Sequence, residues 1–255
     1  MPTISKYLVA VCIFLAITEP GQAGNGDDIA EALASPARTD ADRERDGRDK
    51  PQQVLEFAGF GKGMLIADVF GGGGYYSEIL SVLVGDEGKI LLVNNAPYDA
   101  YVKKELTPRL ADNRLPNVEY LLVPNDAMGL GGDRLDGALI IMSYHDLFYA
   151  DPEDGWPAID GEQFIDQIVT ALKPGGRLLI VDHAARAGTG SDDTQSLHRI
   201  DEDFAVAELS ARGLRWVGST PDLRNADDDR SLSAFDPAIR GQTDRFVHVY
   251  EKPEN

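Results

Sequence analysis

From Pro51 to its end, the chain alternates short apolar segments with helical ones, and this alternation limits the folds open to it. The strand-like segments are continuously apolar, as in MLIADVF at 64–70 and RLLIV at 177–181. Such runs are typical of strands buried on both faces. We therefore predict one doubly wound α/β domain, with a mainly parallel sheet covered by helices on each side. The predicted strands are residues 64–70, 89–93, 118–123, 135–142, 177–181, 214–217 and 245–250.

Helical spacing of apolar residues lies between these strands. The predicted helices are residues 51–57, 75–83, 98–110, 161–172 and 196–212. The segment from Thr220 to Thr243 is rich in Asp, Arg, Ser, Gly and Pro, which predicts a loop with at most a short helix. The predicted organisation is a leader at 1–23, a polar segment with a short helix at 24–50, and one domain at 51–255.

Residues 1–23 have the pattern of a secretory signal peptide. Lys6 precedes an apolar run at 7–18, and Gly21-Gln22-Ala23 has small residues where signal peptidase requires them. The run is short for a bilayer span, which needs roughly 20 residues, so an uncleaved anchor is the less favoured alternative. We expect an exported, periplasmic protein without stable membrane association after cleavage.

The polar segment 24–50 carries Arg43, Arg45 and Arg48 interleaved with acidic residues. Mixed charge of this kind usually forms a solvated, self-paired helix surface. The alternative is a lid helix whose arginines face a ligand.

The charge balance argues against two kinds of partner. Acidic residues number 43 and basic residues 24, which gives a net charge of −19. Nucleic acids and anionic lipids both attract cationic surfaces, so we expect neither, and a small molecule is the expected substrate. The single cysteine, Cys12, excludes an internal disulfide and a cysteine-based metal site.

Four glycines, Gly71 to Gly74, follow the first predicted strand, and Asp68 lies near the end of that strand. In a doubly wound sheet, ligands bind at this point, where glycine admits a ligand to the backbone and to free helix N–H groups. A dinucleotide fingerprint fails because its third glycine would be Tyr76, and no Gly-Lys-Ser/Thr forms a phosphate loop. A carboxylate suits a cationic ligand such as S-adenosylmethionine. The alternative is a turn without a ligand.

Together these features resemble the class I S-adenosylmethionine-dependent methyltransferases over about residues 50–252. The matching motifs are the loop from Asp68 to Gly74, Asn94-Asn95, Asn125-Asp126-Ala127 and Leu172-Lys173-Pro174-Gly175-Gly176. Tyr144-His145-Asp146-Leu147 and Val181-Asp182-His183 resemble, more narrowly, a family of uncharacterised exported bacterial methyltransferases. The resemblance implies a Rossmann-like sheet of seven strands, mostly parallel, with an antiparallel last strand.

The resemblance also implies a set of residues for S-adenosylmethionine. The implied cofactor-binding residues are Asp68, Gly71, Gly72, Gly74, Asn94 and Asp126. Asp68 and the glycines would line the methionine end, and Asp126 would face the adenine amino group. Asn94 or Asn95 replaces the acid that normally holds the ribose, and Phe70 replaces the first glycine of the loop.

Histidines follow two of the predicted parallel strands. His145 is next to Asp146, His183 is next to Asp182, and His198 begins the following helix. Because the carboxyl ends of parallel strands share one rim, we expect these side chains to converge over the cofactor.

Three interpretations of this group are open. In the first and favoured one, His145 or His183 is a general base for methyl transfer, with Asp146 also in the catalytic group. In the second, His145, Asp146, His183 and His198 bind a metal ion. In the third, they are capping and packing residues. His248, within the last strand, is expected to be structural.

We therefore expect methyl transfer from S-adenosylmethionine to an unidentified small molecule, with no metal assigned. Two alternatives stay open. One is an exported, non-catalytic module that binds a small ligand on a methyltransferase fold, and the other is a metal-dependent hydrolase that uses the histidines.

Overall fold

The computed structural model describes residues 25–254. The predicted leader at 1–23, with Cys12, lies outside the described residues. Among the helices of residues 25–254, none combines the length and the apolar character needed to cross a membrane.

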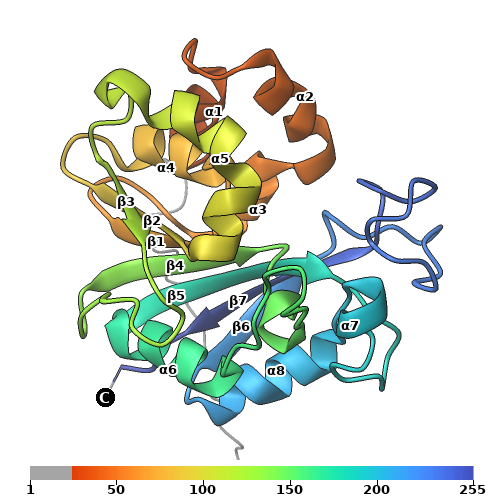
Figure 1. Cartoon of the computed structure of the whole chain (residues 1–255). Helices are drawn as coiled ribbons and strands as arrows, with labels where there is room; N and C mark the ends of the chain where they lie inside the picture. The colour runs from red at the N-terminus through yellow and green to blue at the C-terminus, as the bar shows by residue number, and fades with distance from the viewer. Residues whose placement is uncertain (1–24, 255) are drawn as a thin grey trace, which may run out of the picture.

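A single seven-stranded sheet forms the centre of the molecule, in the order β3-β2-β1-β4-β5-β7-β6 (Figure 1). The strands are β1 (Leu65–Val69), β2 (Lys89–Asn94), β3 (Val118–Leu122), β4 (Leu135–Ile141), β5 (Leu172–His183), β6 (Arg215–Thr220) and β7 (Arg245–Glu251). Strands β1 to β5 pair in parallel, and β7 runs antiparallel to both β5 and β6. The predicted fold class, including the antiparallel last strand, is confirmed.

Helices cover both faces of the sheet (Figure 1). One side carries α1 (Asn25–Ala34), α2 (Asp40–Asp49), α3 (Pro51–Ala58), α4 (Tyr75–Val84) and α5 (Ala96–Leu110). The other side carries α6 (Gly161–Ala171), α7 (Thr194–Leu197) and α8 (Glu202–Ala211). Two 3₁₀ helices, η1 (Ala111–Asn113) and η2 (His145–Phe148), complete these elements.

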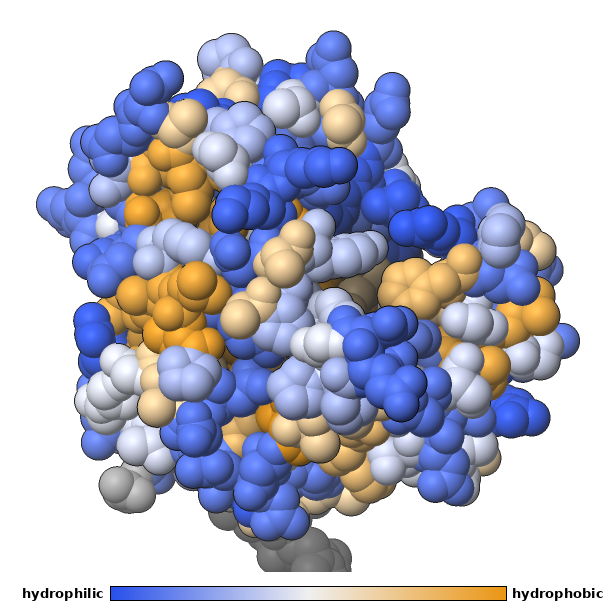
Figure 2. Space-filling view, in the orientation of Figure 1, coloured by the Kyte–Doolittle hydropathy of each residue, from blue (hydrophilic) through white to orange (hydrophobic). Residues whose placement is uncertain are grey.

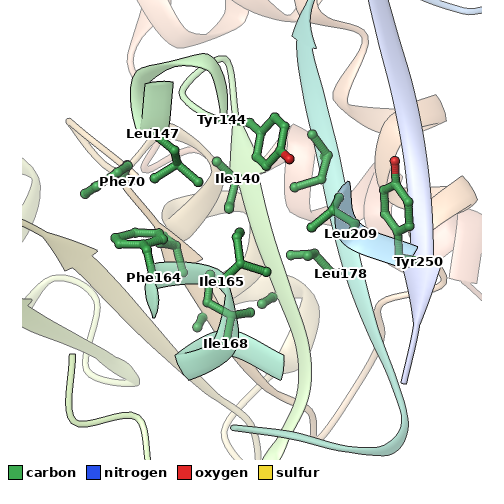
Figure 3. Close-up of a cluster of buried hydrophobic side chains, with 14 of the residues drawn as sticks. Phe70, Ile140, Tyr144, Leu147, Phe164, Ile165, Ile168, Leu178, Leu209 and Tyr250 are labelled. Atoms are coloured by element: carbon green, nitrogen blue, oxygen red, sulfur yellow. The ribbon is translucent and has the colours of Figure 1, made fainter. Parts of the chain in front are cut away.

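Successive residues of the central strands enter different cores, which explains why the strands are apolar at every position. Leu178 and Ile180 of β5 pack with α6 and α8, in the cluster drawn in Figure 3. Leu179 and Val181 pack on the opposite face, with α1, α3 and α4. Both faces of β5 are therefore shielded from water, as the continuous apolar run predicted.

The polar segment 24–50 folds into two helices rather than one, and both pack on the domain. Ile29 of α1 is fully buried between α3 and α4. Helix α2 starts with a capping box between Thr39 and Asp42, and Asp42 also pairs with Arg109 of α5 at 2.8 Å. The prediction of a solvated helix whose charges pair with one another is incomplete, because these charges also pair with residues far along the chain.

The predicted helix at 196–212 is interrupted. Helix α7 ends at Leu197, and His198 follows in a left-handed conformation with φ of +51°. Helix α8 begins only after Asp201, whose side chain caps it by accepting from the N–H of Asp203. The break turns the His198 side chain away from the helical register that the apolar spacing indicated.

A buried ion pair joins the loop at 221–244 to the segment between α7 and α8. This segment contains no helix or strand, which confirms the predicted loop. The guanidinium of Arg199 is fully buried and donates to both carboxylate oxygens of Asp228, at 2.8 and 3.1 Å. It also donates to the backbone carbonyls of Ala184 and Leu232.

Arg199→Ala should therefore destabilise the fold strongly. It leaves the Asp228 carboxylate buried without its cation, and we expect the free energy of unfolding in urea to fall by about 3–5 kcal/mol. The control is Arg215→Ala, which removes an ion pair to Glu251 from a mostly exposed arginine and should cost under about 1 kcal/mol. Equal small losses in the two variants would contradict a structural role for the buried pair.

Candidate functional site

The glycine loop leaves β1 with several residues in the left-handed region. The φ angle is +53° at Phe70, +58° at Gly72 and +79° at Gly74. Glycine adopts this region freely, but a phenylalanine there is strained. Asn94, at the end of β2, holds the loop in place: its side-chain amide accepts from the N–H of Gly72 and donates to the carbonyl of Gly72, both at 3.0 Å. The amide of Asn94 is thus engaged with the loop, and the residue is fully buried.

Strand β2 and helix α5 pack directly onto the same loop. A Cβ atom at Gly71 would lie 2.5 Å from Cδ1 of Leu92, and one at Gly73 would lie 2.8 Å from Oε2 of Glu105. The Nε of Arg109 donates to the carbonyl of Gly73 at 2.6 Å. Two of these glycines therefore admit neighbouring side chains of the protein itself.

Phe70 fills the place next to the ends of β2 and β3, where the resemblance implied adenine. Its ring stacks on Tyr98, with centroids 4.5 Å apart and planes within 7°, and contacts Phe164 at 4.9 Å. The small space between Phe70, Phe164 and the ends of β2 and β3 has no room for a water molecule. Tyr98 and Phe164 thus hold Phe70 in the place implied for adenine. We call this place the seat, and the Phe70 ring fills it.

Asp68 and Asp126 lie apart. Asp68 is buried beneath Gly71, where one of its carboxylate oxygens accepts from the hydroxyl of Ser77 at 2.7 Å. Burial raises the pKa of Asp68 to about 6, against smaller opposing effects of Ser77 and Arg45. Asp126 is exposed on the surface after β3. Asp68, Gly71, Gly72 and Asn94 thus lie together at the ends of β1 and β2, and Asp126 lies on the surface after β3.

The open cavity lies beyond this closed seat, at the ends of β4 and β5. It has a volume of about 380 Å³, and we call it the histidine pocket. Its lining residues are Tyr98, Tyr101, Met142, His145, Asp146, Tyr149, Trp156, His183, His198 and Phe235. Figure 2 shows a hollow on this face, between the main body and the lobe on the right. His145, Asp146, His183 and His198 all line this one pocket. The first three follow β4 and β5, whereas His198 lies between α7 and α8.

Asp182, the penultimate residue of β5, fixes His145. It is fully buried, and its oxygens accept from the backbone N–H groups of His145 and His183, both at 2.7 Å. It also contacts Nδ1 of His145 at 2.8 Å. Burial alone would lower the pKa of His145, but the charges of Asp182 and Asp146 outweigh it and raise this pKa to about 9. Burial opposes the charge of Asp182 too, yet His145 and the hydrogen bonds lower its pKa overall.

His183 occupies a different environment. Its Nδ1 contacts Oγ1 of Thr243 at 2.7 Å, so Nε2 is the nitrogen that can meet a bound molecule. Burial lowers the pKa of His183 to about 3, which leaves the ring neutral. Its centroid lies 5.9 Å from that of His145. His248, in contrast, lies on β7, where it contacts the hydroxyl of Tyr250 and takes no part in the pocket.

The aromatic lining of the pocket escaped the sequence reasoning. Tyr98 lies in the first turn of α5, and its hydroxyl donates to Asp146. Its place just after β2 could have revealed it, because β2 ends at the same edge of the sheet. Trp156 and Phe235 come from irregular loops, and no spacing in the sequence connects them to the histidines.

Comparisons with known proteins show similarity in the fold alone. No protein-family model matches it, and no curated protein matches it. Solved structures do resemble it. An S-adenosylmethionine-dependent methyltransferase from Aquifex aeolicus has a TM-score of 0.58 and 18% identity, over 89% of this chain and 98% of that one.

Two further structures show how varied these neighbours are. An arsenic(III) S-adenosylmethionine methyltransferase from Chlamydomonas reinhardtii has a TM-score of 0.54 and 14% identity, over 89% of this chain and 73% of that one. The [4+2]-cyclase SpnF has a TM-score of 0.57 and 16% identity, over 92% of this chain and 96% of that one. The chain thus has the fold of class I S-adenosylmethionine-dependent methyltransferases, a fold that a named cyclase shares.

The raised pKa of Asp68 predicts a pH-dependent stability difference. Between about pH 4 and pH 6 the unfolded chain loses this proton before the folded chain does, so ionisation of Asp68 costs the wild-type protein stability as pH rises. Asp68→Asn has no such cost. Its stability relative to wild type, from urea unfolding, should be higher at pH 7.5 than at pH 4 by roughly 2–3 kcal/mol. A pH-independent difference would mean that folding does not raise the pKa of Asp68.

Proposed function

We propose that this chain is a hydrolase that acts on a small, mainly apolar molecule in the histidine pocket. One observation carries the proposal: three imidazoles and a carboxylate face a single open cavity, while the seat beside the glycine loop is filled by Phe70. Pockets that combine aromatic walls with a few convergent polar groups are typical of small-molecule sites.

The lining supports the choice of substrate. Tyr101, Trp156 and Phe235 supply large apolar surfaces, and Met142 adds an adaptable one. The polar groups gather at His145, Asp146 and His183 instead of being spread around the wall. We infer that the apolar part of a substrate lies on the aromatic side chains and that its reacting group points to the histidines.

The chemistry needs only water as a co-reactant. The oxygen of water forms a bond to the carbonyl carbon of a bound ester, and its proton passes through Nε2 of His183 to the leaving oxygen as the carbon–oxygen bond breaks. Thr243 holds Nδ1 of this neutral ring, so Nε2 is the nitrogen that faces the cavity and can accept the proton. His145 and Asp146 border the same volume and can hydrogen-bond the attacking water. Such a reaction also agrees with the export that we propose from residues 1–23, because water is present in every compartment.

Hydrolysis can be measured with p-nitrophenyl esters of short and medium acyl chains. We expect the untagged protein to release p-nitrophenol above the buffer rate, and His183→Ala to lose at least about tenfold of that rate. His248→Ala is the matched control, because it removes a buried imidazole outside the pocket. No release with any ester, or equal rates in wild type and His183→Ala at unchanged thermal stability, would refute the proposed function.

S-adenosylmethionine-dependent methyl transfer to a small molecule, with a histidine general base, is the second candidate. The shared fold and the retained Asp68, Gly72 and Gly74 favour it. It would require Phe70 and Tyr98 to leave the positions in which they stack. A non-catalytic ligand-binding module on the same fold would bind in the histidine pocket without turnover.

Calorimetry with S-adenosylhomocysteine separates the candidates. If the closed seat persists in solution, the wild-type protein gives no saturable heat, whereas Phe70→Ala opens space beside Tyr98 and gains binding. Phe204→Ala, which removes a phenyl ring from α8, controls for general loosening. Saturable binding to wild type that disappears in Asp68→Ala would instead favour methyl transfer.

A further inference from the structure

Three potential metal ligands lie close together in the lining of the histidine pocket. His145, Asp146 and His198 each offer one ligand atom, and these atoms all lie within 4.8 Å of one another. We propose that these three side chains bind one divalent ion of the first transition row. The proposal rests on the proposed function, since the ion would lie where the reacting group of the substrate points.

Second partners hold His145 and Asp146 in place. Because Nδ1 of His145 contacts Asp182, its free nitrogen is Nε2, which lies 3.3 Å from Oδ1 of Asp146. The other oxygen of Asp146 accepts from the hydroxyl of Tyr98. A carboxylate behind a ligating histidine is a recurrent feature of metal sites, because it fixes the tautomer and the direction of the ring.

His198 supplies an independent indication. Its Nδ1 is buried and has no hydrogen-bond partner, although buried polar atoms in proteins are nearly always paired. The residue also adopts a left-handed backbone conformation, with φ of +51° and ψ of +49°. The rings of Tyr149 and Phe235 flank it at 4.6 and 4.7 Å. The unpaired ring nitrogen and the sparsely populated backbone conformation are observations on His198 that do not depend on the spacing of the three ligand atoms.

Two neighbouring polar side chains are outside this group. Asp182 uses both oxygens on His145 and His183, and His183 lines the pocket but does not belong to the set of ligand atoms within 4.8 Å of one another. We therefore assign three protein ligands, which leaves coordination positions open toward the cavity. Structural zinc sites are closed by four protein ligands, whereas three with an open position are typical of catalytic sites.

Two imidazoles and one carboxylate define the class of ion. This donor set suits Zn²⁺, Fe²⁺, Mn²⁺ and Co²⁺, whereas Ca²⁺ and Mg²⁺ prefer oxygen ligands alone. Such an ion would bind the attacking water and lower its pKa toward neutrality. The proton released from that water would follow the route through His183 described above.

Direct metal binding tests the site without any substrate. The untagged full chain, dialysed against a chelator, is titrated with Zn²⁺ by calorimetry and with Co²⁺ by visible absorption. We expect one ion per chain, with visible Co²⁺ bands, and at least about 100-fold weaker binding in His145→Ala and Asp146→Asn. Asp182→Asn should weaken binding about 10–100-fold, and His248→Ala should leave it unchanged.

His198→Gly distinguishes a ligand from a structural residue. Glycine adopts the left-handed backbone without the steric cost that other residues have, so the metal-free variant should keep its thermal stability while losing binding at least about 100-fold. Retained stoichiometric binding in this variant would overturn the assignment, as would the absence of stoichiometric binding in wild type.

The two proposals can fail separately. Metal binding that depends on these residues, without release from any ester, leaves the metal site standing and removes the hydrolase. Ester hydrolysis that depends on His183 but is indifferent to chelator and added Zn²⁺, in a protein that binds no metal, leaves the hydrolase standing and removes the metal site.

Discussion

The site depends on one buried carboxylate, that of Asp182. It accepts from two backbone N–H groups and contacts the His145 ring, and these interactions offset the cost of burying its charge. Because β4 and β5 are neighbours, the same side chain joins the ends of both strands. It orients the His145 ring, whose Nε2 lies 3.3 Å from Oδ1 of Asp146.

At the glycine loop, the structure departs from the ligand site that is usual for this fold. In open α/β sheets this strand end is a ligand site, but here Asn94 binds the loop, α5 packs on it, and Phe70 occupies the adjacent space. The cavity lies instead at the ends of β4 and β5. A fold can carry many activities, since function resides in the site, and the cyclase among its structural neighbours agrees with this.

The sequence predicted the elements well where burial alone sets the pattern. Strands such as β5 are apolar throughout because both faces are covered, and this holds wherever the strand lies in the sheet. The convergence of His145, Asp146 and His183 followed from the shared rim of parallel strands. The role of Asn94 and the two N-terminal helices could not be predicted, because the residues that pair with them are distant in the chain: Asp42, for example, meets Arg109.

The sequence by itself determined the α/β class and the edge of the sheet where chemistry could occur, because apolar runs act through local periodicity and parallel strands share one rim. The antiparallel last strand was implied by the resemblance to class I methyltransferases. Only the tertiary structure decided which of two adjacent places at that edge is open. A phenylalanine in a glycine loop can point into solvent or into the seat, and its packing against Tyr98 and Phe164 selects the seat. The unpaired nitrogen of His198 likewise emerges only when η2, β5 and α7 are brought together, since pairing is a property of neighbours in space.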